Sequence, residues 1–403
     1  MSRRSRSNRR GRSRRYDDYD YDYEYEYQDD GYDDYDDYDD YYERPRRGHK
    51  ALFVIFIVLA VLIILAEIAY LAFGHYYNLL DFRSGLSASE RAAAIAGFDV
   101  SSLREEDEID EGYDVATDAE IADIQSRIQA HLAAGGTLIS DDDVVNILLI
   151  GTDARTRTEA ARSDAMILVS LNKRTQKIVL TSFMRDIYTY IPDYGYNRLN
   201  APYAIAGADY LIETLEADFG VSIDSYAAVN FYDFADIIDA LGGIDLTLTN
   251  AEVDFINGQV FDEQLALGVG TGPVWLDYEA SGYYHLNGTQ ALAHCRNRSS
   301  AGSDADRTDR QRAVISEMIT KAKGMSISEL NSLLDVVLPM VVTDLTQADC
   351  LSLILHSGEY LGYTVESIRI PSVGYSFTTI SGMSVISVDF AANAAVIQDA
   401  IYG

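Results

Sequence analysis

Basic residues and cysteines are scarce in this 403-residue sequence. It has 32 Lys and Arg against 64 Asp and Glu, which gives a formal net charge of −32. A chain this acidic is a poor general nucleic-acid binder, because phosphate backbones are bound by net basic surfaces. With two cysteines, Cys295 and Cys350, one internal disulfide and two buried thiols both stay open. His294 beside Cys295 is weak support for a nucleophilic thiol, since a base adjacent in sequence rarely has the required geometry.

The longest apolar run, residues 51–73, predicts a transmembrane helix. Sixteen uninterrupted apolar residues begin at Ala51, and Glu67 is the only charge in the segment. About 23 residues at roughly 1.5 Å rise per residue cover roughly 34 Å, enough to cross the hydrocarbon core. The basic flank "ERPRRGHK" precedes the run, whereas only Arg83 follows it closely. We therefore expect a single-pass protein of the cell membrane, with a cytoplasmic N-terminus and residues 74–403 outside the cell.

The first 50 residues are predicted to be a disordered cytoplasmic tail. Residues 1–15 hold eight arginines, and residues 16–43 hold 15 Asp and Glu and 11 Tyr with no basic residue. Because the Asp/Tyr stretch has no aliphatic residues, it cannot form a packed core. A docking or phosphorylation segment for a cytoplasmic partner is the alternative interpretation.

Residues 74–143 are expected to be an extracellular, partly helical stalk. Within them, residues 118–134 place Ile121, Ile124, Ile128 and Leu132 on one helical stripe, and Gly135 ends the pattern. We expect this stalk to hold the following domain away from the bilayer.

From residue 144 to residue 403 the pattern is that of an α/β domain. The runs "VVNILLIG", "AMILVSLN" and "KIVLTSFM" are short and continuously apolar, which is typical of strands covered on both faces. A helix over 203–219, a strand in "SYAAVNF" and a helix over 233–241 follow. This alternation predicts a three-layer αβα sandwich with ligands bound at the strand ends.

A cluster of arginines stands out in the later part of this domain. Asn287 is expected to cap a short helix that leads into Arg296 and Arg298, which point the same way if the chain is extended. Arg307 and Gln311 are four residues apart and share a face of the next helix, which is expected to run to residue 323.

Two interpretations of the arginine cluster remain open. The helix dipole disfavours cations in the first turns, so arginines there favour a bound anion, and arginine suits bidentate phosphate recognition. Ion pairs with Asp306 and Asp309 are the alternative, although exposed pairs contribute only ~0–1 kcal/mol each.

Seven ordered motifs in this region resemble the LytR-CpsA-Psr (LCP) family of cell-wall phosphotransferases. They are "NILLIGTDAR", "RSDAMILVSLN", "SFMRDIY", "NRLNAPYAIAGADYLIETLE", "YAAVNFYDFADIIDALGGIDL", "LNGTQALAHCRNR" and "DADRTDRQR". The resemblance implies an LCP-like catalytic domain with a mixed central sheet. It also implies transfer of a glycopolymer phosphate, of teichoic acid, capsule or a similar polymer, from a polyprenyl-pyrophosphate carrier to peptidoglycan.

The same resemblance implies roles for individual residues. Asp153 and Asp164 would hold Mg²⁺ on the pyrophosphate, and Mg²⁺ prefers such carboxylate oxygens. The residues expected to bind the substrate are Arg185, Asn200, Arg296, Arg298, Arg307 and Gln311, all but Asn200 also expected to act in catalysis. Two other functions stay open: a hydrolase that cleaves lipid pyrophosphate with water, and a membrane-anchored regulator or sensor of the envelope.

Overall fold

The structure is a computed structural model that describes residues 59–64, 72–98, 113–135, 138–154, 161–267, 275–280, 282–297 and 304–403. Residues 63–403 form one compact unit. The predicted tail and most of the predicted span lie outside the described residues. Among the residues that are described, no helix has both the length and the hydropathy needed to cross a membrane.

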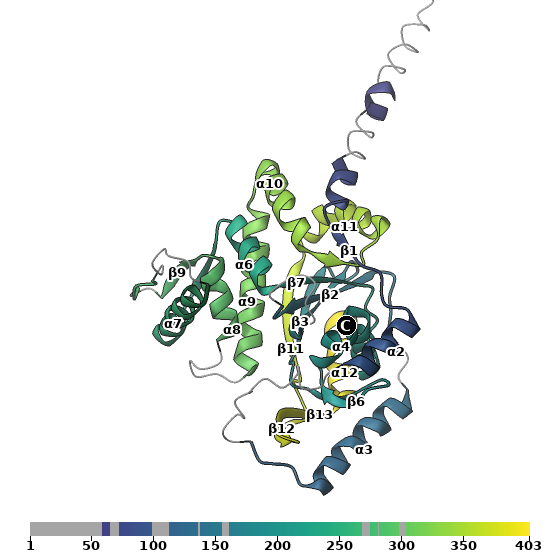
Figure 1. The fold of residues 1–403 in the computed structure, drawn as a ribbon. Helices are drawn as coiled ribbons and strands as arrows, with labels where there is room; N and C mark the ends of the chain where they lie inside the picture. Colours follow the sequence, from purple (N-terminus) through teal and green to yellow (C-terminus); the bar gives the residue numbers. More distant parts are fainter. Residues whose placement is uncertain are drawn as a thin grey trace, which may run out of the picture. The chain divides into compact units, whose positions relative to one another are not determined.

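A seven-stranded mixed sheet forms the centre of this unit (Figure 1). Its order is β1-β10-β7-β2-β3-β4-β11; β2, β3 and β4 are antiparallel neighbours, while β7 runs parallel to β2 and β11 parallel to β4. The strands are β1 (Asp81–Phe82), β2 (Val144–Thr152), β3 (Ser163–Asn172), β4 (Lys177–Phe183), β7 (Ser225–Asn230), β10 (Val342–Thr343) and β11 (Thr364–Ile370). The three apolar runs of the sequence are therefore strands, as predicted, and the structure places them next to one another in the sheet.

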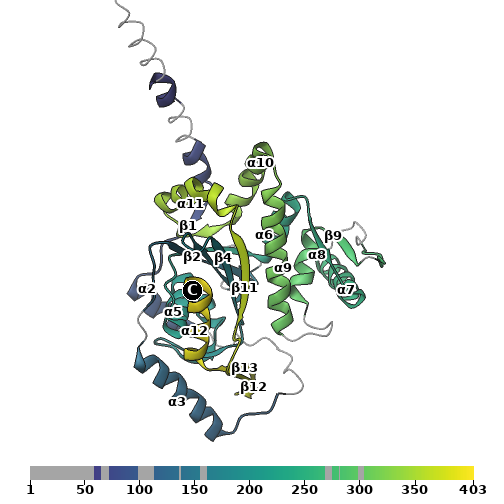
Figure 2. The ribbon, with the colours of Figure 1, turned by 180° about the vertical axis from the view of Figure 1, so that it is seen from behind.

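Both faces of the sheet are covered, which explains why these strands are continuously apolar. Leu148 and Leu168 point into the larger core, where they meet side chains of α3 (Asp118–Ala134), α5 (Ala208–Phe219) and α12 (Phe390–Tyr402). Ile167 and Leu180 point the other way and meet α9 (Asp304–Lys323) and α11 (Gln347–Tyr360). The mixed sheet and its two helical layers agree with the predicted sandwich (Figures 1 and 2).

Shorter elements surround the central sheet. A separate apolar core joins α6, α7, α8, α9, β8 and β9 on the α9 side. The remaining bounds are α2 (Ala88–Gly97), β5 (Tyr188–Ile191), β6 (Gly195–Arg198), α4 (Ala201–Ala206), α6 (Phe231–Ala240), β8 (Ile244–Thr247), α7 (Asn250–Leu267), β9 (Tyr283–Leu286), α8 (Gly288–Arg296), α10 (Ile327–Val337), η2 (Leu338–Met340), β12 (Tyr375–Ile380) and β13 (Met383–Val388).

The helix predicted over residues 203–219 is wrong in its continuity. The segment forms two helices, α4 and α5, with Gly207 between them at φ 83° and ψ −165°. This backbone conformation is essentially restricted to glycine and ends the first helix. The chain therefore turns between α4 and α5 instead of continuing as one rod.

Residues 74–143 differ from the expected stalk. Residues 81–82 form β1 and pair with β10, so this segment supplies an edge strand of the central sheet. Helix α3 has the predicted bounds, but Ile124 and Ile128 are buried in the larger core. The apolar stripe of α3 thus packs against the domain, because this packing removes its isoleucine side chains from water.

Two helix starts follow from local capping. Asn287 caps α8 as predicted: its side-chain oxygen accepts from the Gln290 N–H, and the Gln290 side chain accepts from the Asn287 N–H, both at 2.9 Å. Helix α6 begins two residues earlier than predicted, because the Asn230 side chain accepts from the Asp233 N–H at 2.8 Å. Both caps satisfy amides that would otherwise be unpaired at a helix start.

Candidate functional site

Three of the predicted site residues lie at one edge of the central sheet. Asp153 follows the end of β2, Asp164 is the second residue of β3, and Arg185 comes two residues after β4. Because β3 is antiparallel to both of its neighbours, the end of β2, the start of β3 and the end of β4 meet at the same edge. The register of β2 and β3 shifts between Gly151 and Thr152, close to these aspartates.

Arg185 and Asp164 form a buried ion pair. The Arg185 Nη1 lies 2.9 Å from Asp164 Oδ1, and the two side chains are 3% and 15% exposed. The Arg185 Nε lies 3.5 Å from Asp186 Oδ1, and Arg198 Nη1 lies 3.2 Å from the same oxygen. These pairs extend the charged network from β4 to the β5–β6 hairpin.

Asp153 has its own arginine partner. Its carboxylate accepts from the Arg162 backbone N–H at 2.9 Å and from Arg162 Nη2 at 3.1 Å. Arg162 is 5% exposed and immediately precedes β3. This double contact fixes the Asp153 carboxylate across the end of the strand pair.

Arg307 joins this network from a distant part of the sequence. It lies in the first turns of α9, which packs near β4 and β11, and it is 3% exposed. Burial would raise the pKa of the Asp164 carboxyl, but the charges of Arg185, Arg307 and Arg162 and the Arg185 hydrogen bond outweigh burial and lower that pKa. Arg185 and Arg307 therefore both act on one carboxylate, which stays ionised.

The seven residues Asp153, Arg162, Asp164, Arg185, Asp186, Arg198 and Arg307 are called the charged cluster below. Four guanidinium groups stand against three carboxylates. A diphosphate entering the cluster would meet the negative charges of Asp153 and Asp164 as well as the arginines. Binding of a polyanion is therefore favoured when a further cation offsets the two carboxylates.

The residues present fit Mg²⁺ as that cation. Asp153 and Asp164 supply hard oxygen ligands at adjoining strand ends, and the low pKa of Asp164 keeps its carboxylate available. Among the described residues, no group of three or more His, Cys, Asp or Glu forms a metal cage. Mg²⁺ commonly uses one or two carboxylates and completes its shell with water and substrate phosphate oxygens, so two aspartates suffice.

The other predicted residues are placed differently. Arg296 is the last residue of α8, so it is not in the extended chain that we expected, and it is exposed. Its guanidinium carbon lies 5.6 Å from the ring centre of Phe231, which directly follows β7. Arg298 lies outside the described residues, and Gln311 is half-buried one turn after Arg307 on α9.

Asn200 is buried beside the charged cluster. Its backbone N–H donates to the Arg185 carbonyl at 3.2 Å, and its carbonyl accepts from the Ser163 hydroxyl at 3.5 Å. Within the described part of the chain, the Asn200 Nδ2 has no hydrogen-bond partner. A buried amide without a partner costs stability, so this donor suits a ligand that supplies the missing acceptor.

Sequence reasoning did not identify Arg162, Asp186 and Arg198 as members of the cluster. A signal for Arg198 was present: it is the only Lys or Arg between Arg185 and Arg296. A lone arginine in such an acidic stretch needs a specific partner, and here that partner is Asp186.

The neighbourhood of the cysteines is not a catalytic site. Both cysteines are free thiols, and burial raises the pKa of Cys295 to about 12. Burial also lowers the pKa of His294 to about 4, a shift that Glu252 partly opposes and Arg310 reinforces. With these pKa values, proton transfer from the Cys295 thiol to His294 is strongly disfavoured, so the two residues do not form a nucleophilic pair.

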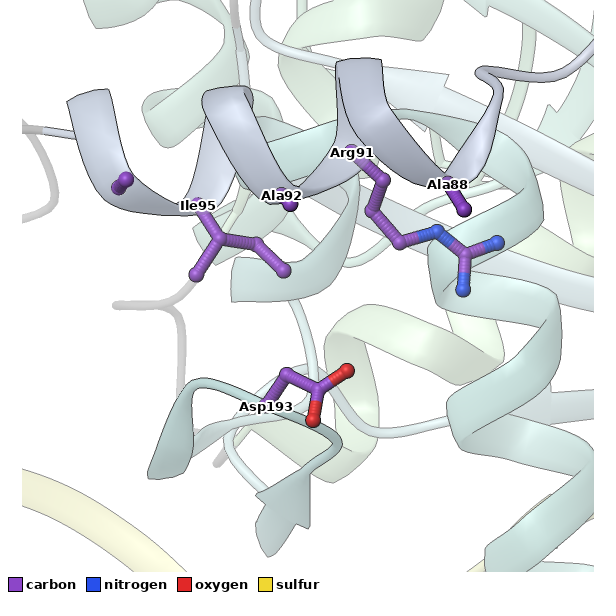
Figure 3. Close-up of a pocket in the computed structure, with 6 residues that line it drawn as sticks. Ala88, Arg91, Ala92, Ile95 and Asp193 are labelled. Carbon is purple, nitrogen blue, oxygen red and sulfur yellow. The ribbon is translucent and has the colours of Figure 1, made fainter.

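A cavity of about 410 Å³ lies apart from the charged cluster (Figure 3). It is bounded by α2 and the β5–β6 turn and lined by Ala88, Arg91, Ala92, Ile95, Ala96 and Asp193. None of the predicted site residues lines it. We place the functional site at the charged cluster, because its charges are buried and convergent, whereas half of the cavity lining is alanine and only Arg91 and Asp193 are charged.

Comparison with known proteins agrees with these motifs. The LytR_cpsA_psr family matches residues 105–399, well over half of the chain. This chain belongs to the LytR_cpsA_psr family. The match includes every element that contributes to the charged cluster, and it begins before α3, in agreement with the packing of that helix on the domain.

Individual relatives show how far the similarity extends. The polyisoprenyl-teichoic acid–peptidoglycan teichoic acid transferase TagU of Oceanobacillus iheyensis is 36% identical over 216 residues, 52% of this chain and 61% of TagU. Biofilm regulatory protein A of Streptococcus mutans is 32% identical over 267 residues, 62% of this chain and 61% of that protein. The solved structure of TagT bound to LIIa-WTA has a TM-score of 0.52 and 26% identity, covering 65% of this chain and 93% of that structure. This member of the family thus shares the fold of TagT, and it spans about three fifths of the length of TagU and of Biofilm regulatory protein A.

Proposed function

We propose that this chain is a membrane-anchored phosphotransferase that moves a glycopolymer phosphate from a polyprenyl-pyrophosphate carrier to peptidoglycan. The observation that carries the proposal is the convergence of Arg185 and Arg307 on Asp164 at one edge of the sheet. The name of the TagU relative, a teichoic acid transferase, and the ligand of the TagT structure support the same class of reaction.

The proposed reaction needs charge neutralisation more than covalent participation by the protein. An acceptor hydroxyl oxygen bonds to the phosphorus that bears the glycan, the bond from this phosphorus to the bridging oxygen breaks, and polyprenyl phosphate leaves with the electron pair while the hydroxyl proton is released. Negative charge grows on the leaving phosphate, and prepositioned guanidinium groups stabilise such charge. Arg185 and Arg307 are held for this role by burial and by Asp164.

The remaining residues bind and orient the diphosphate. Mg²⁺ held by Asp153 and Asp164 would offset negative charge on the diphosphate oxygens. Asn200 offers a buried N–H donor next to Arg185. Arg296 ends α8, Gln311 lies one turn after Arg307 on α9, and Arg298 lies between these two helices in the sequence, so the three are proposed to contact the outer oxygens.

The test is transfer by the purified full-length chain in detergent, supplied with a lipid-linked glycan, peptidoglycan fragments and Mg²⁺. Arg307→Ala should reduce the transfer rate by about 10²- to 10³-fold, the usual effect of removing one transition-state donor. Asp164→Ala should also lose activity, because it removes both the metal ligand and the partner of Arg185.

Arg312→Ala is the matched control. Arg312 lies on the same helix as Arg307, but it pairs with Asp309. It should retain near-normal transfer. Equal rates in the Arg307→Ala and Arg312→Ala variants would contradict the proposal.

A hydrolase with water as acceptor would use the same residues. Products separate the two reactions: transfer requires peptidoglycan and yields a polymer-linked product, whereas hydrolysis proceeds without it and yields free glycan phosphate.

The similarity to Biofilm regulatory protein A favours a regulator as a second candidate. A regulator that signals through its tail would keep wall-polymer attachment in Arg307→Ala cells and lose its phenotype when residues 1–43 are deleted. The transferase proposal expects the opposite pair of results.

A further inference from the structure

Helix α11 has an apolar face that no described residue covers. Leu351, Ile354, Leu355 and Leu361, the residue that follows the helix, are 43%, 56%, 72% and 55% exposed. Their spacing places them on one side of the helix axis. We call these four residues the α11 stripe. A soluble surface rarely gathers so many large aliphatic side chains on one helix without a partner.

The opposite face of α11 is already used for folding. Leu353 and Tyr360 pack into the core on the α9 side of the sheet, together with Ile167 and Leu180. The α11 stripe is therefore not the face with which α11 packs on the core. It is a second apolar face on the same helix, directed away from the sheet.

The α11 stripe lies at the end of the unit where residues 75–77, which follow the predicted membrane span in the sequence, pack against it. The His75 Nε2 lies 3.3 Å from Asp335 Oδ1 on α10, and the Tyr76 hydroxyl donates to the Asn331 side chain on α10. The Tyr77 hydroxyl donates to the Leu345 carbonyl at 3.4 Å, one residue before the cap of α11. In both ribbon views α10, α11 and β1 lie together at this end (Figures 1 and 2).

These contacts leave little free chain between the span and the domain. Residue 73 ends the predicted span, contacts to α10 begin at His75, and β1 pairs with β10 from Asp81. Tyr76 and Tyr77 are also of the residue type that is enriched at membrane interfaces. If residues 51–73 cross the bilayer, α10 and α11 lie against its surface.

The negative charge of residues 326–361 limits the kind of contact that this end of the unit can make with lipid. Residues 326–361 contain Glu329, Asp335, Asp344, Asp349 and Glu359 and no Lys or Arg. Anionic headgroups would not attract this surface, so the contact has to come from apolar side chains.

We propose that the α11 stripe inserts into the outer surface of the bilayer and fixes the orientation of the domain. The proposal relies on the predicted span and not on the proposed chemistry. Strand β4 begins beside α11 and ends six residues later, next to Arg185, which is roughly 20 Å away at ~3.3 Å per residue. The inserted helix would thus direct the charged cluster away from the lipid, toward the cell wall.

The experiment measures insertion depth by tryptophan fluorescence. The full-length chain has one tryptophan, Trp275, so the Trp275→Phe variant provides a background without tryptophan. Leu355→Trp in this background reports on the stripe, and Val115→Trp is the matched control, because Val115 is 74% exposed and lies beside the β12–β13 hairpin. Both proteins are reconstituted into phosphatidylcholine vesicles that contain lipids brominated at shallow or deep acyl positions.

We expect strong quenching of Leu355→Trp by shallow bromines, weaker quenching by deep bromines, and little quenching of Val115→Trp. An interfacial helix buries its apolar face about 5–10 Å into the headgroup and acyl boundary, within reach of the shallow positions. Emission from Leu355→Trp that is not quenched would overturn the proposal. A blue-shifted but unquenched emission would overturn it in favour of a second copy of the chain on the stripe.

Two further outcomes are informative. Equal quenching at both positions would mean that the whole surface adsorbs to lipid, and it would also overturn the specific contact. An alkaline carbonate wash of the same vesicles tests the span itself. A chain that washes off lacks the anchor, and the proposed orientation then fails while the proposed chemistry at the charged cluster is untouched.

Discussion

At the residue scale, the charged cluster shows how burial and charge act together. Arg185 and Arg307 are each 3% exposed, which is costly for a guanidinium unless carboxylates compensate it. Asp164 supplies that compensation, and the attraction of its carboxylate to the two guanidinium groups also lowers its pKa. Buried, prepositioned charges interact more strongly with a phosphate than solvated ones, which is the reason that the proposed function places the diphosphate at this cluster.

Asp218 is a buried carboxyl whose pKa is shifted in the opposite direction to that of Asp164. It is fully buried in α5 and accepts one hydrogen bond, from the Thr189 hydroxyl at 2.8 Å, while its Oδ2 has no partner within the described residues. Burial raises its pKa well above the usual range, and the Thr189 hydrogen bond offsets this only in part. The folded chain therefore keeps a proton on Asp218 that the unfolded chain releases.

This difference predicts a pH-dependent effect of Asp218→Asn on the free energy of unfolding. In the wild type, the contribution of protonated Asp218 to the free energy of unfolding is fully present below the unfolded-state pKa. It is lost as the pH rises toward the raised folded-state pKa, because the folded state binds a proton that the unfolded state has released. The amide is neutral at every pH and can still accept from Thr189. We expect the variant to gain stability relative to wild type as the pH rises from about 4 to 7. Urea unfolding at several pH values checks this, and a pH-independent difference would refute it.

At the element scale, the break between α4 and α5 depends on one backbone conformation. Gly207 has φ 83° and ψ −165°, and an added Cβ would meet no atom within 4 Å. Any penalty for a side chain there is therefore backbone strain and not a clash. The break directs α4 beside α5, with Asn200 at the start of α4 and next to Arg185.

We predict opposite effects for two glycine substitutions. Gly207→Ala should lower the free energy of unfolding by about 1–3 kcal/mol, the usual cost of this conformation for a residue other than glycine. Gly258→Ala is the matched control, because Gly258 lies within α7 and also has open space around its Cβ position. It should raise stability by about 0.5–1 kcal/mol, since alanine favours helix. Urea unfolding of the two variants in parallel measures both signs; the same sign in both would contradict the explanation.

At the scale of the whole molecule, the domain begins earlier than the apolar strand pattern indicated. The β1 strand and α3 come from the segment expected to be a stalk, yet one extends the sheet and the other covers it. The family match from residue 105 agrees with the position of α3. The segment after the predicted span is thus part of the folded unit and not a spacer outside it.

A substitution in α3 tests this boundary. Ile128 is 3% exposed in the larger core, so Ile128→Ala should reduce the free energy of unfolding by about 2–5 kcal/mol, as for other buried isoleucines. Val115→Ala, in the same segment but 74% exposed, should change it by less than about 0.5 kcal/mol. Thermal unfolding followed by circular dichroism compares them. If Ile128→Ala were as harmless as Val115→Ala, α3 would be a stalk after all.

The sequence by itself determined the features that depend on near neighbours. Continuous apolar runs identified β2, β3 and β4, and Asn287 with Gln290 identified the start of α8, because burial on both faces and capping are properties of a few consecutive residues. The motifs likewise identified Asp153, Asp164, Arg185 and Arg307 as candidates.

Only the tertiary structure decided which of these residues meet and which others join them. Asp164 on β3 and Arg307 on α9 come together because α9 packs near the end of β4, a result of folding the whole sheet. Arg198 joins through Asp186, whereas Arg296 lies exposed against Phe231. Spacing along a chain fixes the direction of neighbouring side chains. The energy of burying a charged side chain depends instead on the oppositely charged groups that distant segments place beside it.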